Sequence, residues 1–437
     1  MTAAPASQTT AKDVLAPRTT ELEFGGFAGA LFISTTVPLT AYYFALGCND
    51  VLGCALSLPV SNTDAFVDYV RENLATSFTD GTAWAFYTGW YLYCVLAWYI
   101  LPGKWVKGLP LRTGRQLEYK TNALATGLVA LAAAVGYIIV YGPASSTILY
   151  DHWLGLLSVA LVNSIAQALY VYVASFSGHK LLALGGNTGN VVYDWFIGRE
   201  LNPRIGLFDI KTFNELRPGL ILWVLVDASC ACWQHTQFGY VSDSMWLVLF
   251  FHTWYVVDSL LHEETIFSQM DITTDGFGFM LSVGDLVWVP FTYSLQARYL
   301  AFEPVHLGAI GVLAIMAVQL IGYYIFRTAN VEKNDFRQGH NPKNLQFMTT
   351  STGRKLLVSG WWGVSRHPNY LGDWLMAWAW CLTCGFGSPI PYFYVVYFAI
   401  LLVHRQLRDD EACKKKYGAD WDTYCKRVPY RIIPYIY

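Results

Sequence analysis

Apolar stretches of bilayer length recur along the whole chain, with polar connections between them. A helix needs about 20 mostly apolar residues to cross the hydrocarbon core of a bilayer. The pattern therefore predicts an all-α polytopic membrane protein with about ten transmembrane helices. We expect them near residues 27–47, 82–101, 122–142, 153–176, 219–238, 245–261, 278–297, 305–326, 370–386 and 390–403. The last two segments are short and are followed or interrupted by Gly and Pro, so they also fit a tilted hairpin.

The charges of the connections predict the orientation of the chain. Connections 102–121, 177–218 and 327–369 are rich in Lys and Arg, whereas connection 48–81 holds five acidic residues and one arginine. Basic connections are retained on the cytosolic side of a membrane. Because the predicted number of helices is even, both termini and the polar C-terminal region are expected in the cytosol. The acidic connection after residues 245–261 breaks the alternation, and is either a solvated face or part of a site.

The composition agrees with a membrane protein. Of the 437 residues, 54% are hydrophobic and only 14% are charged, whereas soluble domains carry about 25% charged residues. The 17 Trp and 29 Tyr residues suit interfacial aromatic belts and a flat apolar ligand. A net charge of −2 argues against nucleic acid as a partner. Residues 1–24 are mostly small and polar, and are expected to form a disordered tail.

The nine cysteines are scattered, and their spacing predicts no metal site. Cys381 and Cys384 form a CxxC pair inside an apolar segment, where we expect packing rather than metal or redox chemistry. Cys48 and Cys54 lie in a polar connection and would form a disulfide if that connection faces an oxidising lumen. The sequence leaves this pairing open.

Two basic, aromatic-rich patches flank the last apolar segments. The first, residues 366–373, opens a helix with Pro368 near its first turn. The second, residues 404–418, extends an apolar helix into solvent. A turn between the two apolar segments would bring both patches to one side of the membrane.

A third basic group lies at residues 331–337, where Lys333 and Arg337 are four positions apart and share one helix face. These cations either anchor the chain at the cytosolic surface or bind the phosphates of a nucleotide. Cationic side chains beside aromatic rings suit a ligand that carries both phosphate and a ring. Because no GxGxxG motif or P-loop is present, helix ends and side chains would have to hold it.

Polar residues also occur inside the apolar segments. Tyr255, Asp258 and His262 share one helix face, and Asp227 and Asp285 lie in neighbouring segments. Each of them alone is explained by a satisfied buried polar group. Together they indicate a polar pocket within the membrane that suits proton transfer.

Two stretches resemble the signatures of a known family. GNVVYDWFIGRELNPR (189–204) and LVHRQLRDDEACKKKYG (402–418) are similar to the sterol reductases of the endoplasmic reticulum. This family includes sterol C14-, C7- and C24(28)-reductases and the membrane half of lamin B receptor. Within the family, LLVSGWWGVSRHPNYLGD (356–373) looks most like the C14-reductases.

The resemblance implies a multi-pass enzyme of the endoplasmic reticulum membrane that reduces the C14=C15 bond of a sterol with NADPH. It implies a membrane domain over residues 25–437, with a cofactor-binding part at about 327–437. The sterol would come from the bilayer, beside membrane lipids, and the oligomeric state is left open. Arg408 joins the cofactor candidates because of its charge, and the resemblance gives the others: Lys333, Arg337, Leu357, Trp362, Asn369, Tyr370, Asp409, Cys413, Lys416, Tyr417 and Tyr424.

An isolated alkene accepts hydride only if a proton reaches the neighbouring carbon. The reaction therefore needs an acid in a dry pocket facing the nicotinamide. The candidates are Tyr255 first, then Asp258 or Glu263. The alternatives are a C7- or C24(28)-reductase, an isoprenylcysteine or lipid methyltransferase with a similar C-terminal hairpin, and a receptor without enzymatic activity.

Overall fold

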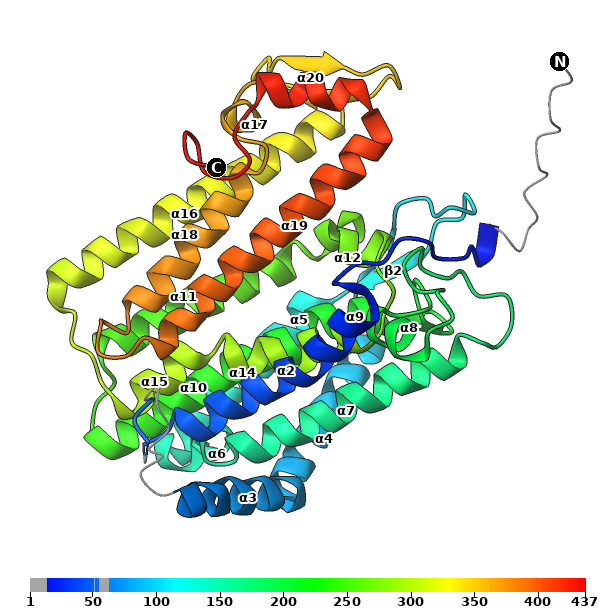
Figure 1. Ribbon diagram of the computed structural model, residues 1–437. Helices are drawn as coiled ribbons and strands as arrows, with labels where there is room; N and C mark the ends of the chain where they lie inside the picture. The colour runs from blue at the N-terminus through cyan, green and yellow to red at the C-terminus, as the bar shows by residue number, and fades with distance from the viewer. Residues whose placement is uncertain (1–13, 51, 55–62) are drawn as a thin grey trace, which may run out of the picture. The chain divides into compact units, whose positions relative to one another are not determined.

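A computed structural model describes residues 14–50, 52–54 and 63–437. These residues are mostly helical, with three two-stranded antiparallel sheets (Figure 1). The chain divides into two compact units. Unit 1 comprises the chain up to Val241 together with His252–Glu303, and unit 2 comprises Ser242–Phe251 with Pro304–Tyr437.

Unit 1 is built from long helices joined by short helical turns. Its long helices are α2 (Gly26–Gly47), α3 (Thr63–Thr79), α4 (Gly81–Ile100), α5 (Ala123–Tyr141), α7 (Trp153–Ala174) and α10 (Pro218–Phe238). The shorter ones are η1 (Pro143–Ser146), α6 (Ile148–Asp151), α8 (Val191–Ile197), α9 (Ile210–Leu216), η2 (Glu263–Ser268), α12 (Met270–Thr273), α13 (Phe279–Val283), the π-helical turn η3 (Gly284–Trp288), α14 (Val289–Thr292) and α15 (Leu295–Phe302). Helix α11 (Asp243–Leu261) contributes to both units.

The strands of unit 1 form two small hairpins. β1 (Lys104–Lys107) pairs with β2 (Glu118–Thr121), and β3 (Arg204–Ile205) pairs with β4 (Phe208–Asp209). Helix α10 is buried along most of its length and packs against α14 and α15. Trp223 at its centre is fully buried. The apolar sequence of α10 therefore forms the core of unit 1.

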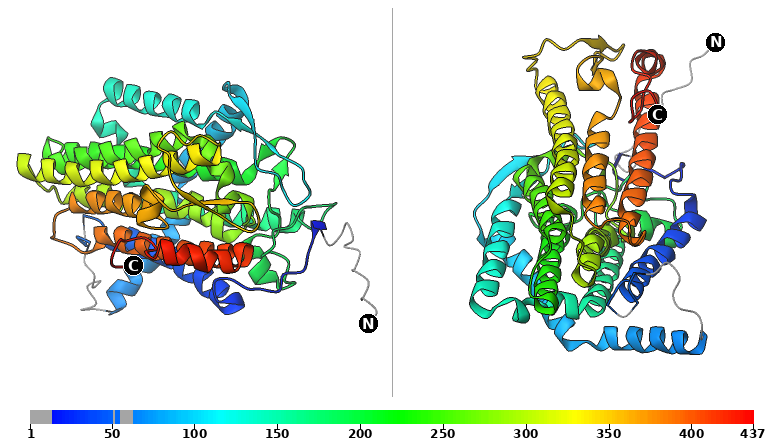
Figure 2. Two further views of the ribbon diagram at one scale, coloured as in Figure 1. Left: turned by 90° about the horizontal axis from the view of Figure 1, so that it is seen from above. Right: turned by 90° about the vertical axis from the view of Figure 1, so that its left-hand side faces the viewer.

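Unit 2 is organised around three helices that run side by side (Figure 2). They are α16 (Gly308–Arg337), α18 (Pro368–Leu382) and α19 (Phe393–Tyr417), with the short elements β5 (Phe347–Thr349), β6 (Lys355–Leu357), α17 (Trp361–Val364), η4 (Ile390–Tyr392) and α20 (Ala419–Arg427). A Cβ on Gly372 would lie only 2.5 Å from the Phe326 amide nitrogen. The α16 and α18 backbones therefore approach closely, as small residues allow in membrane helices.

Seven helices of the described residues are long and apolar enough to cross a membrane. They are Gly26–Gly47, Ala123–Tyr141, Trp153–Ala174, Ile210–Phe238, Asp243–Leu261, Gly308–Arg337 and Ile390–Tyr417. The prediction of a mostly helical chain with several membrane-crossing helices is confirmed, while the count of ten stays a prediction.

The three remaining expected spans differ from these seven for separate reasons. Helix α4 has 20 residues but is rich in Trp and Tyr, which lower its mean hydropathy. Helix α18 has only 15 residues. The segment expected at 278–297 is broken into short helices by the turn η3. The sequence pattern placed helical structure correctly there but did not show these interruptions.

The structure adds detail to the polar connection 48–81 and to the N-terminal segment. The polar connection 48–81 contains helix α3, which the search for apolar runs missed because α3 is largely polar. Cys48 and Cys54 form a disulfide. Within the segment 1–24, the Leu15 carbonyl oxygen accepts from the Leu182 amide at 2.9 Å. Residues 1–13 of that segment lie outside the described residues.

Candidate active site

Unit 2 contains all twelve predicted cofactor residues. They lie on six elements that follow one another in the chain, from the end of α16 to α20. The members are Lys333 and Arg337 on α16, Leu357 on β6, Trp362 on α17, Asn369 and Tyr370 on α18, Arg408, Asp409, Cys413, Lys416 and Tyr417 on α19, and Tyr424 on α20.

The end of α16 is joined to α17 through an aromatic ring. The Lys333 ammonium lies 3.8 Å from the centroid of the Trp362 ring. Trp362 is buried, and its indole N–H donates to the Ala329 carbonyl oxygen at 2.9 Å. The Trp361 amide donates to the Glu332 carboxylate at 2.8 Å, which fixes the start of α17. A cation held over an aromatic face is stabilised by the ring quadrupole and stays available to an anion.

His367 lies at the start of α18, where it contacts an aromatic ring and an acidic side chain. Its ring stacks on Tyr370 with centroids 4.8 Å apart. Its Nε2 lies 3.7 Å from an oxygen of Asp409. Burial, together with the positive charges of Lys333, Arg366 and Arg405, lowers the pKa of His367 to about 3. His367 is therefore neutral near pH 7, and the half-exposed Asp409 carboxylate is not neutralised by it.

Asn369 offers a polar atom to a ligand. Its amide nitrogen donates to Asn330 Oδ1 at 3.3 Å. Its side-chain carbonyl oxygen, Oδ1, is buried and has no hydrogen-bond partner among the described residues. Buried polar atoms of native proteins are nearly always paired. An acceptor left over beside several cations fits a polar ligand such as a dinucleotide.

A buried arginine ties the start of α18 to α19 and α20. Arg366 donates to Asp410 Oδ1 at 2.8 Å, and the Trp421 indole donates to the same oxygen at 3.0 Å. The Arg366 and His367 amides donate to the carbonyl oxygens of residues 430 and 431 at 2.9 Å. The sequence pattern identified residues 366–373 as a basic patch but not the roles of Asp410 and Trp421, because a run of charges does not reveal which carboxylate turns inward.

Several of the predicted cofactor residues also serve the packing of unit 2. Tyr424 is buried in a cluster with Met348, Trp421 and Val428, against which Cys413 and Tyr417 pack. Burial raises the pKa of the Tyr424 phenol, which therefore stays protonated at all physiological pH values. The packing of these aromatic and apolar side chains holds the polar groups of α19 in position.

The three proton-donor candidates belong to unit 1 and differ in their surroundings. Glu263 is buried, with one oxygen accepting from Arg217 at 2.8 Å and the other from the Ala123 amide at 2.8 Å. Both oxygens of this carboxylate are therefore already hydrogen-bonded within the fold. This arrangement favours a structural role for Glu263 at the start of α5.

Tyr255 and Asp258 lie on α11, before Glu263 in the chain. The Tyr255 ring centroid is 6.2 Å from that of the buried Trp223. An oxygen of the Asp258 carboxylate is 3.4 Å from His262 Nδ1. Helical spacing thus brings Asp258 and His262 together as the sequence predicted, and Tyr255 lies beside the core of α10.

The sequence analysis missed a second buried pair beside Tyr255. His252 Nδ1 lies 2.8 Å from Asp227 Oδ2, and both side chains are fully buried. The Trp223 indole N–H donates to His252 Nδ1 at 3.1 Å. Asp227 was recognised as a buried acid, but a single histidine in an apolar run carries no signal of its own.

The stretch 189–204 is organised by its own side chains. One oxygen of Asp194 accepts from the Thr188 amide and hydroxyl, and the other accepts from the Gly189 amide. Asn190 caps α8 by accepting from the Tyr193 amide at 3.0 Å. Gly198 adopts φ +92°, where any side chain would be strained. These contacts show that the stretch is an ordered loop held by its own side chains.

The sequence was compared with known proteins. It matches the ergosterol biosynthesis ERG4/ERG24 family over residues 18–437. It is 50% identical to a delta(14)-sterol reductase of Schizosaccharomyces pombe over 95% of this chain and 97% of the relative. It is 45% identical to a delta(14)-sterol reductase of Candida albicans and 44% identical to one of Saccharomyces cerevisiae, in each case over 97% of this chain and 99% of the relative. The resemblance seen in the two signature stretches is confirmed, and the chain belongs to the ergosterol biosynthesis ERG4/ERG24 family.

Proposed function

We propose that this chain is a delta(14)-sterol reductase that reduces the C14=C15 double bond of a sterol intermediate with NADPH. The observation that carries the proposal is the identity of 44–50% to three delta(14)-sterol reductases over nearly the full length of each. The cluster of cations, aromatic rings and one exposed carboxylate in unit 2 supports it.

The groups of unit 2 fit a phosphorylated dinucleotide. Lys333, Arg337 and Arg408 would bind its phosphates, including the 2′-phosphate that distinguishes NADPH from NADH. The Asn369 carbonyl oxygen and the Asp409 carboxylate would accept from its hydroxyl and amide groups. When bound, NADPH would supply the hydride that reaches C14. We place the cofactor-binding part at about residues 327–437 of a membrane domain that spans residues 25–437.

The proton that reaches C15 would come from Tyr255, Asp258 or Glu263. Tyr255 ranks first because a phenol has an ordinary pKa of about 10 and is protonated at neutral pH. Its ring lies 6.2 Å from that of the buried Trp223, centroid to centroid, close to the core of unit 1. Asp258 would orient Tyr255 or relay the proton. Glu263 ranks last, since Arg217 and the Ala123 amide occupy both of its oxygens.

We further propose that the chain crosses the endoplasmic reticulum membrane ten times with both termini in the cytosol. The disulfide Cys48–Cys54 supports a lumenal position for the end of α2, because disulfides persist in the lumen and are rare in the cytosol. Tags placed before Gly26 and after Tyr437 should both be digested by protease in sealed microsomes. Protection of either tag would refute this topology.

The activity is tested in cells that lack sterol C14-reductase. Expression of the chain should remove the accumulated C14-unsaturated sterols, measured by mass spectrometry of the sterol fraction. The Asp409→Asn variant, matched for expression, should leave them in place. Removal of a C7 or C24(28) double bond instead would assign the chain to another reductase of the family, and an unchanged sterol profile would refute the proposal.

A further inference from the structure

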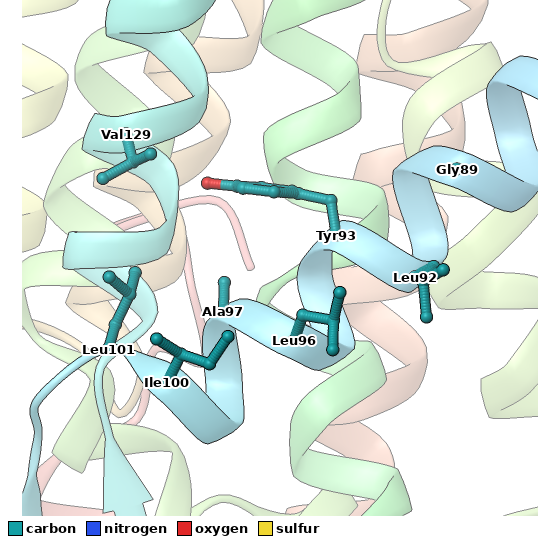
Figure 3. Close-up of a pocket in the computed structure, with 8 residues that line it drawn as sticks. All are labelled: Gly89, Leu92, Tyr93, Leu96, Ala97, Ile100, Leu101 and Val129. Carbon is teal, nitrogen blue, oxygen red and sulfur yellow. The ribbon is translucent and has the colours of Figure 1, made fainter.

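An open apolar groove of 340 Å³ runs between α4 and α5 in unit 1 (Figure 3). Leu92, Leu96 and Ile100 line it from α4, and Val129 faces them from α5. All four side chains are exposed, at 46–75% of their full accessibility. The volume lies within the range of small-ligand sites, about 300–1,000 Å³.

The groove presents hydrocarbon but no free polar group. Tyr93 reaches across it, and its hydroxyl donates to the Thr126 carbonyl oxygen at 2.8 Å. Tyr93 supplies the one side-chain polar atom of the lining, and that atom is already bonded. An occupant must therefore be held in the groove by apolar contact alone, and its polar part must lie at an end.

The length of the groove corresponds to one leaflet of a bilayer. Its lining residues extend from Gly89 on α4 to Leu101, the residue that caps the helix. At 1.5 Å per residue, these 12 steps cover about 18 Å along the helix. Half of a 30 Å hydrocarbon core is about 15 Å. The groove thus suits an extended acyl chain that runs from the membrane interface to the midplane.

The interfacial end of the groove carries an unpaired cation. Lys104 follows Leu101 by three residues, is exposed, and has no acidic partner among the described residues. Trp105 beside it is 46% exposed and stands edge-on to Trp98 at 6.2 Å. Exposed Trp next to Lys is typical of the membrane–water interface. Lys107, by contrast, lies opposite Glu118 in the β1–β2 hairpin.

This end of the groove is rigid. The Lys120 ammonium donates to the carbonyl oxygens of Trp98 and Tyr99 at 2.8 and 3.1 Å. The Asn122 amide donates to those of Ala97, Trp98 and Leu101. These bonds close the end of α4 and fix the hairpin next to it. The backbone that carries Lys104, three residues after Leu101, is therefore fixed before any ligand binds, which lowers the entropy lost on binding.

We propose that the α4–α5 groove binds one acyl chain of an anionic phospholipid, with the lipid phosphate at Lys104. Charge decides the class of lipid, because a single Lys near a membrane surface contributes about 1 kcal/mol toward an anionic headgroup. The hydroxyl of a sterol is neutral and offers no opposite charge to this cation. The inference is independent of the reductase activity proposed above.

The test uses the full-length protein in nanodiscs of phosphatidylcholine with one-fifth phosphatidylserine. Lipids that stay bound after extraction into detergent are counted by native mass spectrometry. The wild-type protein should retain one phosphatidylserine in preference to phosphatidylcholine. Lys104→Gln should lower this preference about 5-fold, the ratio that corresponds to 1 kcal/mol. Lys107→Gln should lower it less, because Glu118 offsets its charge.

A groove-filling variant tests the apolar part. A Cβ on Gly89 meets no atom within 4 Å, so Gly89→Leu enters the groove without disturbing the helix. It should abolish the retained lipid. The matched control Gly136→Leu, on α5 and also free of contacts, should retain it. Equal retention of the two lipids by the wild-type protein, equal behaviour of the two leucine variants, or displacement of phosphatidylserine by ergosterol would each overturn the proposal.

Discussion

Substitution of two adjacent aspartates on α19 by asparagine should have different effects, one on stability and the other on activity. Asp410 accepts hydrogen bonds from the buried Arg366 and from Trp421, and its side chain is 25% exposed. Asp409 is 41% exposed, and its near neighbour His367 is neutral at pH 7. We expect Asp410→Asn to destabilise unit 2, and Asp409→Asn to remove activity with little change in stability.

The magnitudes follow from these surroundings. Removing one partner of a fully buried ion pair costs about 3–5 kcal/mol, and a charge-assisted hydrogen bond contributes about 1.5–3 kcal/mol. Because Asp410 is partly solvated, about 2 kcal/mol is the appropriate expectation for Asp410→Asn. Asp409 has no charged partner within 4 Å among the described residues, since its neighbour His367 is neutral near pH 7. For Asp409→Asn we therefore expect a change in stability within about 0.5 kcal/mol, as for other surface positions.

The assay combines thermal unfolding in detergent, followed by tryptophan fluorescence, with sterol reduction normalised to folded protein. Asp410→Asn should lower the melting temperature by about 4–8 °C and keep measurable turnover per folded molecule. Asp409→Asn should melt like the wild-type protein and reduce no sterol. If both substitutions lowered the melting temperature by the same amount, Asp409 would have a structural role and the distinction between the two aspartates would be wrong.

Three further predictions address the cofactor site, the proton donor and the response to pH. Lys333→Gln should raise the KM for NADPH and narrow its advantage over NADH, whereas equal use of both cofactors by the wild-type enzyme would contradict the phosphate assignment. Tyr255→Phe should keep sterol and NADPH binding, measured at equilibrium, but slow turnover on the order of 100-fold; near-normal turnover would place the donor elsewhere. The pKa of His367 is about 3 in the folded protein and about 6.5 in the unfolded chain. As the pH falls below about 6.5, the unfolded state therefore binds a proton that the folded state does not. Stability should therefore fall as the pH drops from about 6.5 toward 3, and a pH series of melting temperatures should be flatter for His367→Asn.

The sequence predicted the helices well where a single rule decides them. Long apolar runs have only one stable form in a bilayer, so α2, α5, α7, α10, α11, α16 and α19 were found close to their observed positions. Helix α3 was missed because a polar helix shows no apolar run. The break at Gly284–Trp288 was missed because a π-helical turn depends on packing rather than on composition.

For the candidate site, residue type and spacing were enough to collect the cations of unit 2 but not to assign their partners. The pairing of Arg366 with Asp410, rather than with Asp409, depends on a difference of one position along α19. Likewise, the sequence indicated Glu263 as a candidate acid, but in the fold both of its carboxylate oxygens accept hydrogen bonds. Such pairings are long-range, and no local pattern records them.

The signature at residues 402–418 therefore combines residues needed for the fold with residues suited to ligand binding in one short stretch of sequence. Successive residues of a helix point about 100° apart, so neighbouring positions face different surroundings. In α19 this turns Asp410 toward Arg366, while Asp409 stays near the neutral His367. Cys413 and Tyr417, one turn apart, pack against the buried Trp421 and Tyr424. A match to the signature identifies the family because fold and chemistry are both fixed in it, but the match alone does not separate the residues that hold the site from those that would meet the ligand.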